Sequence, residues 1–226
     1  MDSRYYQVRR GEGVAAVLCD AVAVLAGYLL GSLPFAFIIT KLATGKDIRF
    51  EGEGNVGARN VLHVAGPIPG LLTLLLDAGK GAAAYYLGHR WGSGDLALYL
   101  AGFALMLGHG FPVWLGWRGG KGMGPATGFL LPMWPYAVLS ALLILIAARA
   151  VIPDFNLSLT LAGAAFPFLT LWEGNDLQGL LFIVFFLGMA GIKKVIDLPH
   201  ERAMRAKSGW TEGLAHARHT RRHDAG

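Results

Sequence analysis

Long uninterrupted runs of apolar residues constrain this chain more than any other feature of its sequence. Most of the runs reach the ~20 residues that a helix needs to cross a hydrocarbon core of about 30 Å. In lipid only helices and closed barrels satisfy every backbone hydrogen bond, and barrel strands would alternate in polarity. We therefore expect an all-α, polytopic integral membrane protein. Its apolar blocks cover residues 14–43, 64–88, 96–117, 123–148, 155–172 and 177–192.

Composition agrees with a membrane location and excludes several other classes of protein. Only 15% of the residues are charged and 54% are hydrophobic, whereas a soluble domain carries about 25% charged residues. A cleaved signal peptide is an alternative for the first block, but that run is too long and further blocks follow it. The single Cys19 cannot form an internal disulfide, and the sequence holds no Cys/His metal framework. The net charge of +5 comes without a basic stripe interleaved with aromatics, so we expect no nucleic acid partner.

The positions of lysine and arginine between the blocks predict the orientation in the membrane. Two polar segments are rich in cations: the first island (45–60, GKDIRFEGEGNVGARN) and the second island (117–124, WRGGKGMG). The short link after block 123–148, which contains Arg149, and the C-terminal segment are also basic. By the positive-inside tendency, all four segments face the cytoplasm.

This orientation requires block 123–148 to leave the cytoplasm and return. Its 26 residues make only about 39 Å of helix, enough for one crossing. Pro132 and Pro135 lie near its middle, where proline stops or kinks a helix. We therefore expect a hairpin of two short helices, about seven transmembrane segments and an outside N-terminus, with six spans as the alternative. The predicted domains are a transmembrane domain, residues 1–195, and a basic cytoplasmic tail, residues 196–226.

The two islands combine glycines, cations and amides, which suit the binding of phosphate at a membrane surface. Residues 52–57 match G-x-G-x-x-G, but a dinucleotide fingerprint requires a βαβ unit. Closely spaced glycines can still direct backbone N–H groups at an oxyanion, and Arg59 adds a fork suited to phosphate. Lys121 lies among glycines without forming a Walker A motif, because Gly122 replaces the required Ser/Thr. A tight turn and an interfacial lysine anchor are the alternative interpretations.

Some polar and small residues inside the blocks need a reason to be there. Asp77 and Lys80 share one helical face, and each buried charge costs ~2.5–3.5 kcal/mol in a membrane. They are expected to pair with each other or to form a polar floor beneath the islands. His109 has two equally favoured interpretations: a hydrogen-bonding residue at the end of a helix, or a residue that binds a ligand. Gly27 and Gly31 form a GxxxG motif, which predicts a close helix–helix contact.

Several short motifs together resemble a known family. They are GSLPF at 31–35, GNVGARNV at 54–61, LLLD followed by KG within 74–81, GH at 108–109 and GGKG at 119–122. This order is similar to that of bacterial acyl-phosphate:glycerol-3-phosphate acyltransferases, clearly over about residues 20–130 and by span layout beyond. The resemblance implies a seven-helix protein of the bacterial cytoplasmic (inner) membrane with its site at the cytoplasmic face. It also implies transfer of a fatty acyl group from acyl phosphate to the 1-hydroxyl of glycerol 3-phosphate, which gives lysophosphatidic acid for phospholipid biosynthesis.

The same resemblance implies the residues of the site and its partners. Lys121 is the expected catalytic residue, which stabilises developing charge. Because acyl phosphate has a good leaving group, positioning and charge stabilisation can suffice without a metal or another cofactor. The expected partners are acyl phosphate, glycerol 3-phosphate, membrane lipids and an enzyme that produces acyl phosphate. The expected substrate-binding residues are Gly54, Asn55, Gly57, Arg59, Asn60, His63, His109, Gly119, Gly120, Asn156 and His200.

Five positions depart from the family pattern and leave a second hypothesis open. Glu53 replaces a serine, Arg59 a threonine and His63 an arginine, while Asn156 stands in for a serine and Ala203 for an asparagine. As an anion beside a phosphate site, Glu53 is expected to repel substrate. The alternative is therefore a non-catalytic or substrate-shifted paralogue that binds lipid or phosphate. A small-solute transporter is disfavoured because the sequence shows no inverted repeat.

Overall fold

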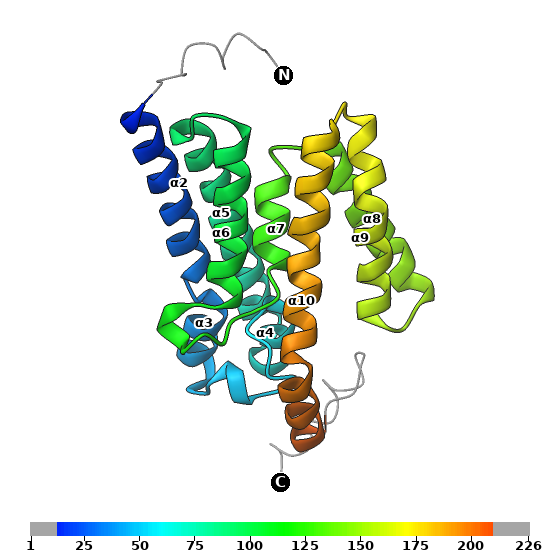
Figure 1. The fold of residues 1–226 in the computed structure, drawn as a ribbon. Helices are drawn as coiled ribbons and strands as arrows, with labels where there is room; N and C mark the ends of the chain where they lie inside the picture. The colour runs from blue at the N-terminus through cyan, green and yellow to red at the C-terminus, as the bar shows by residue number, and fades with distance from the viewer. Residues whose placement is uncertain (1–12, 210–226) are drawn as a thin grey trace.

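The computed structural model describes residues 13–209, and within this range the chain forms helices and no strands. The long helices stand side by side, and the short elements α3, η1 and α4 gather at one end, which we call the site end (Figure 1). The all-α prediction is confirmed. In chain order the elements are α2 (Val14–Ser32), α3 (Phe35–Thr44), η1 (Ile48–Phe50), α4 (Ala58–Ala65), α5 (Pro67–Trp91), α6 (Asp95–Gly110), η2 (Val113–Leu115), α7 (Met123–Leu130), α8 (Pro135–Val151), α9 (Phe155–Trp172) and α10 (Leu177–Ser208).

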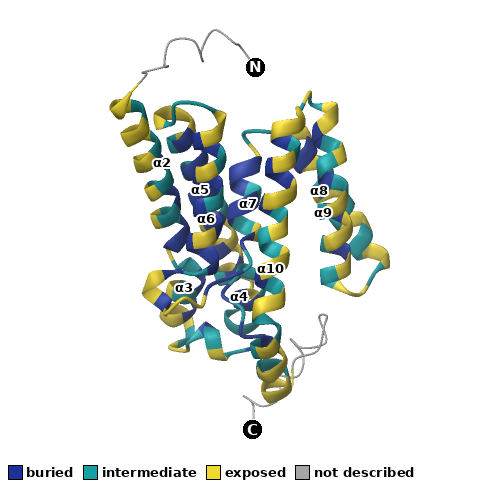
Figure 2. Cartoon of the chain, in the orientation of Figure 1, coloured by how far each residue is buried: buried dark blue, intermediate teal, exposed yellow. Residues whose placement is uncertain are grey.

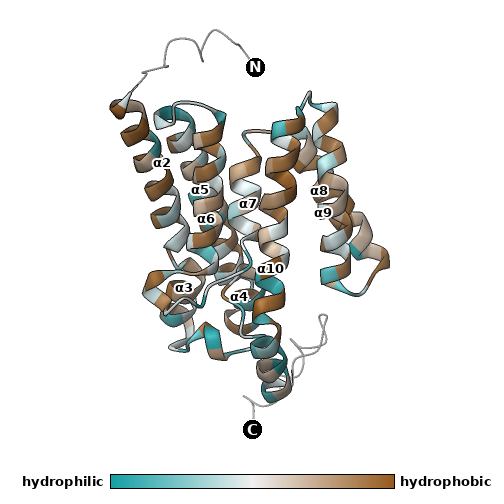
Figure 3. Cartoon of the chain, viewed as in Figure 1, coloured by the Kyte–Doolittle hydropathy of each residue, from teal (hydrophilic) through white to brown (hydrophobic). Residues whose placement is uncertain are grey.

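The outer surface of the bundle is apolar. Exposed positions follow the outward sides of the helices (Figure 2), and many of them are hydrophobic (Figure 3). Leu143, Ile146 and Phe185 are 67%, 67% and 65% exposed, which only a lipid environment makes favourable. Four helical stretches are long and apolar enough to cross a membrane, namely Val14–Thr44, Asp95–Leu115, Phe155–Trp172 and Leu177–Ser208, while α8 is apolar but shorter. The count of seven spans stays a prediction.

The block 123–148 is divided as its two prolines predict. Helix α7 ends at Leu130, a turn covers residues 131–134, and Pro135 occupies the first turn of α8, where its missing N–H costs nothing. Helix α7 begins near the site end and runs away from it, and α8 runs back towards the site end (Figure 1). The predicted break is therefore confirmed, and the two helices leave space between them rather than pack along their length.

Glycines bring α2 and α6 into backbone contact. A Cβ added at Gly27 would lie 2.5 Å from the carbonyl oxygen of Ala101, and one added at Gly31 would overlap the carbonyl of Leu105. The contact is reciprocal, because a Cβ at Gly108 would overlap the carbonyl of Tyr28. The helix contact predicted from the GxxxG motif is confirmed.

The predicted pair of Asp77 and Lys80 is also confirmed and has a structural task. Lys80 Nζ lies 2.9 Å from Asp77 Oδ1. It also donates to the carbonyl oxygens of Gly31 and Leu33, at 3.0 and 2.8 Å. These carbonyls are at the break before Pro34, where α2 cannot continue. The buried cation thus satisfies the backbone groups that the break leaves without helical partners.

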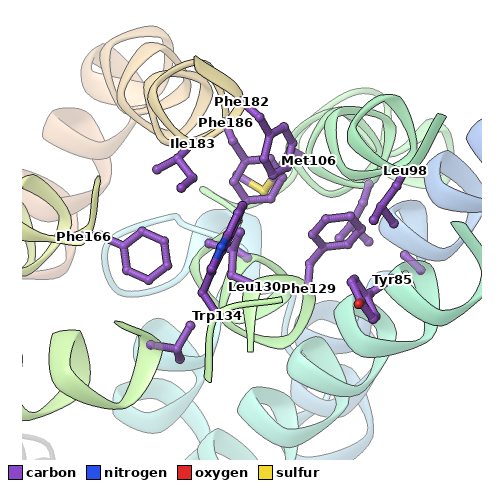
Figure 4. Close-up of a cluster of buried hydrophobic side chains, with 14 of the residues drawn as sticks. Tyr85, Leu98, Met106, Phe129, Leu130, Trp134, Phe166, Phe182, Ile183 and Phe186 are labelled. Carbon is purple, nitrogen blue, oxygen red and sulfur yellow. The ribbon is translucent and has the colours of Figure 1, made fainter. Parts of the chain in front are cut away.

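An aromatic cluster anchors α10 to the centre of the bundle (Figure 4). Phe182 and Phe186 of α10 have ring centroids 5.0 Å apart, and Phe186 stacks on Phe129 of α7 at 5.8 Å. All three side chains are at most 3% exposed. This packing fixes the axis of α10, and with it the position of the turns that follow.

Helix α10 runs without interruption through the domain boundary predicted after residue 195 and ends at Ser208. Its 32 residues are about 48 Å long, so it extends past a hydrocarbon core of about 30 Å. The division into domains stays a prediction, and positions 210–226 of the predicted tail lie outside the described residues.

Candidate active site

The two islands meet at the site end of the bundle. Gly120 lies so close to the first island that an added Cβ would overlap the carbonyl of Val56 and the ring of His109. The N–H groups of Gly119 and Gly120 donate to the carbonyls of Gly110 and His109, both at 3.1 Å. Gly119 and Gly120 therefore allow close approach of two backbones, and their N–H groups are engaged within the protein rather than forming the predicted nest for an oxyanion.

The side chain of Asn60 stabilises the first island through hydrogen bonds to its backbone. Its side chain is fully buried. Its Nδ2 donates to the carbonyls of Glu51 and Asn55, at 2.9 and 3.0 Å, and its Oδ1 accepts the N–H of Glu53 at 3.1 Å. Gly54 has φ +72°, and an added Cβ would lie 2.7 Å from Met204 of α10. Asn60 and Gly54 thus shape the loop instead of facing a substrate.

A cleft of about 600 Å³ starts at the islands and continues between α5 and α7 on one side and α8 and α9 on the other. Its polar mouth brings together six of the predicted residues: Asn55, Gly57, Arg59, His109, Lys121 and Asn156. The rest of the wall is mainly apolar and includes Leu74, Leu142 and Phe166. The other predicted positions do not line the cleft; they are Gly54, Asn60, His63, Gly119, Gly120 and His200.

Lys121 is the cation of the second island at this mouth. Its side chain is 15% exposed, and Nζ lies 2.6 Å from Glu201 Oε1. Burial lowers the pKa of Lys121 below the ordinary lysine value, while the negative charges of Glu53 and Glu201 oppose that shift. A partly desolvated ammonium interacts more strongly with a phosphate than one in water, because the local dielectric constant is lower.

Glu53 is paired, which corrects the expectation that its carboxylate repels substrate. Its side chain is 1% exposed, and Oε2 lies 2.9 Å from Arg205 Nη2 and 3.7 Å from Arg59 Nη1. The guanidinium of Arg59 also stacks over the ring of Phe155, 4.5 Å from its centroid. Four cations, including Lys194, which lies 2.8 Å from Glu201 Oε2, face two carboxylates. This ion-pair network therefore carries a net positive charge, and its members Arg205, Lys194 and Glu201 do not themselves line the cleft.

The remaining predicted residues lie outside the lining of the cleft. His200 Nε2 lies 2.8 Å from the carbonyl oxygen of Arg49, so it ties α10 to the first island. His63 is partly exposed on α4, and Ala203 is exposed on α10. Arg205, Lys194 and the carboxylate of Glu201 were not predicted as site residues. The signal that could have found them is the i, i+4 spacing of Glu201 and Arg205 in a helix that continues past the last apolar block.

An apolar cleft that ends in a cationic mouth, in an all-α membrane bundle, is the architecture expected of a membrane enzyme that acts on phosphate-bearing lipid precursors. The family model described as glycerol-3-phosphate acyltransferase matches residues 21–203. The chain belongs to this glycerol-3-phosphate acyltransferase family, and it is an integral membrane enzyme.

Named relatives agree with this assignment over nearly their whole length. Glycerol-3-phosphate acyltransferase 1 of Dehalococcoides mccartyi is 38% identical over 190 residues, which are 78% of this chain and 88% of the relative. The glycerol-3-phosphate acyltransferase of Paramagnetospirillum magneticum is 40% identical over 198 residues, 84% of this chain and 97% of the relative. A crystal structure of PlsY, an integral membrane glycerol 3-phosphate acyltransferase in its glycerol 3-phosphate form, is similar with a TM-score of 0.73 and 28% identity, covering 82% of this chain and 93% of that one.

Proposed function

We propose that this protein transfers a fatty acyl group from acyl phosphate to the 1-hydroxyl of glycerol 3-phosphate and releases lysophosphatidic acid and inorganic phosphate. It does so in the cytoplasmic membrane of a bacterium, with the mouth of the cleft towards the cytoplasm. The observation that carries the proposal is the joining of a cationic mouth, with Arg59 and Lys121, to an apolar cleft between helices. Both substrates carry phosphate, and one of them also carries an acyl chain.

Each part of the cleft has a task in this reaction. Arg59, with Asn55 beside it, binds the phosphate of glycerol 3-phosphate, because a guanidinium matches phosphate geometry. The apolar walls hold the acyl chain. Lys121 stabilises the charge that develops as the hydroxyl oxygen bonds to the acyl carbon and the bond from that carbon to the phosphate oxygen breaks. The departing phosphate takes up the hydroxyl proton. Holding both substrates in one mouth replaces a bimolecular encounter by a positioned reaction.

The location of the mouth also indicates where the partners come from. Glycerol 3-phosphate is water-soluble and reaches the mouth from the cytoplasm, whereas acyl phosphate enters the cleft from the lipid side. An enzyme that produces acyl phosphate is therefore a functional partner. In this arrangement residues 1–195 form the transmembrane domain, and residues 196–226 act on the cytoplasmic side.

The proposal is tested with the purified full-length protein, acyl phosphate and radiolabelled glycerol 3-phosphate, followed by lipid extraction. We expect labelled lysophosphatidic acid, and a loss of at least ~10²-fold in rate for Lys121→Ala, which is the scale of removing one preorganised donor. Lys41→Ala is the matched control, because Lys41 is exposed and bonds the carbonyl of Gly45 outside the cleft. No labelled product above background from the unmodified protein would favour the non-catalytic paralogue.

A further inference from the structure

Two side chains on the last turns of α10 hold the two islands separately. Glu201 Oε1 lies 2.6 Å from Lys121 Nζ of the second island. Arg205 Nη2 lies 2.9 Å from Glu53 Oε2 of the first island. Glu201 and Arg205 are four residues apart, so they lie one above the other on the same helical face. One face of one helix therefore contacts both halves of the mouth.

The two carboxylates in these pairs are almost completely buried. Glu53 is 1% exposed and Glu201 is 2% exposed. Removing one partner of a buried ion pair leaves an uncompensated charge, which is strongly destabilising. Neither island can therefore move away from α10 without separating a buried charge from its partner.

The turns that carry these side chains are themselves fixed on the first island by two further hydrogen bonds. His200 Nε2 is 2.8 Å from the carbonyl of Arg49, and Ser208 Oγ donates to the carbonyl of Gly52 at 2.8 Å. At its other end, α10 is anchored by its aromatic residues in the core. The position of this segment is thus determined from both directions.

We propose that residues 200–208 of α10 act as a clamp that sets the spacing between the two phosphate-binding cations. In this clamp Glu201 positions Lys121, and the Arg205–Glu53 pair positions Arg59, which lies 3.7 Å from the same Glu53 oxygen. Glu201, Arg205 and Glu53 are positioning residues, because they act through Lys121 and Arg59. The inference rests on the proposed function and adds to it the residues that assemble the mouth.

The role of Glu201 is tested by the pH at which the transfer rate falls, a quantity that general destabilisation of the protein does not change. The carboxylate of Glu201 favours the charged form of Lys121, so Glu201→Gln should lower the pKa of Lys121. We expect the alkaline fall of the transfer rate to move to lower pH in Glu201→Gln and to return towards the original position in Glu201→Asp. An alkaline fall at the same pH in all three proteins would overturn this part of the inference.

The Arg205 part is tested by a double-mutant cycle on the Michaelis constant. Arg205→Gln should raise KM for glycerol 3-phosphate about ten-fold. Without Arg205, Glu53 competes more strongly with the substrate phosphate for Arg59. Adding Glu53→Gln removes that competition and should restore most of the lost affinity, with KM for acyl phosphate changed less. Independent, multiplicative effects of the two substitutions would overturn the pairing. If Arg205→Gln does not fold, Arg205→Lys, which keeps the charge but not the fork, should raise KM less, and Glu53→Gln should again reverse the rise.

Arg202→Gln is the matched control, since Arg202 is an exposed cation on the same segment, and it should leave both KM values and the pH profile unchanged. The pH dependence of Lys121 modification by an amine-reactive reagent, followed by mass spectrometry, reads the Glu201 effect without relying on transfer activity. An inactive unmodified protein would therefore contradict the proposed function, whereas unshifted Lys121 modification in Glu201→Gln would contradict the clamp.

Discussion

Glycines allow close helix packing on one side of the cleft and leave open space on the other. On the side of α5 and α7, an added Cβ at Gly81 would overlap the carbonyl of Pro125, and one at Gly128 would overlap the carbonyl of Ala78. Across the cleft on α9, and on the neighbouring α10, a Cβ built at Gly163 or Gly188 would meet no described atom within 4 Å beyond the adjacent residues and backbone of its own helix. The first group brings helix backbones together, whereas the second leaves room around the helix.

This difference separates two requirements of the site. Cations that hold phosphate must be placed within a fraction of an ångström, which needs rigid neighbours. The acyl chain has no polar groups to align, so its part of the cleft needs space and an apolar wall. Helix α7, which packs on α5, starts at Met123, just after Lys121, and the open side is formed by α8 and α9, where the wall is apolar.

The largest effect is expected from a side chain placed on the rigid side. Gly128→Leu forces α7 away from α5, because the neighbouring atoms are backbone and cannot rotate away. We expect no monodisperse protein in size-exclusion chromatography after detergent extraction. The control Gly188→Leu, on an exposed position of α10, should elute and melt like the unmodified protein. A folded Gly128→Leu with unchanged thermal stability would remove the contrast between the two sides.

A side chain on the open side should change specificity instead of folding. Gly163 lines the cleft with free space around it, so Gly163→Leu should fold and shorten the space for the acyl chain. We expect the ratio of kcat/KM for stearoyl phosphate to that for lauroyl phosphate to fall about ten-fold, the scale of a crowded apolar pocket. Gly188→Leu is again the control, and an unchanged ratio in Gly163→Leu would show that the chain lies elsewhere.

The smallest effect concerns pH and should be confined to the polar mouth. Because burial lowers the pKa of Lys121, the lysine loses its charge at a lower pH than an ordinary lysine does. The transfer rate should therefore fall as pH rises through that value, whereas the preference between acyl chains should not change with pH. Lys121→Arg keeps its charge throughout and should lack the fall, whatever its absolute rate. The same fall in both proteins, after correction for spontaneous hydrolysis of acyl phosphate, would exclude Lys121 as its source.

Much of the fold could be predicted from local patterns. Apolar blocks identify the long helices because a membrane requires both length and low polarity. The break at residues 131–134, the GxxxG contact of Gly27 and Gly31 and the Asp77–Lys80 pair all depend on residues close together in the sequence. Such features follow from helix geometry and need no knowledge of tertiary structure.

Features of the site that depend on distant residues could not be predicted in this way. Glu53 seemed to oppose phosphate binding because its partner Arg205 is 152 positions away. Asn60 was expected to bind substrate, since an amide suits a ligand and a buried loop equally well, and only the packed structure shows its bonds to loop carbonyls. Local sequence identifies the chemical groups of the mouth, whereas the tertiary fold decides which of them remain available.

The contribution of α10 also determines when the mouth is completed during synthesis. Both islands leave the ribosome long before residues 200–208, since chains emerge from the N-terminus onwards. Lys121 and Glu53 therefore reach the membrane surface before their partners Glu201 and Arg205, which they acquire with α10. A chain terminated before residue 200 keeps almost all of its apolar helices and still lacks a finished catalytic centre, so only protein that includes residues 200–208 would consume acyl phosphate.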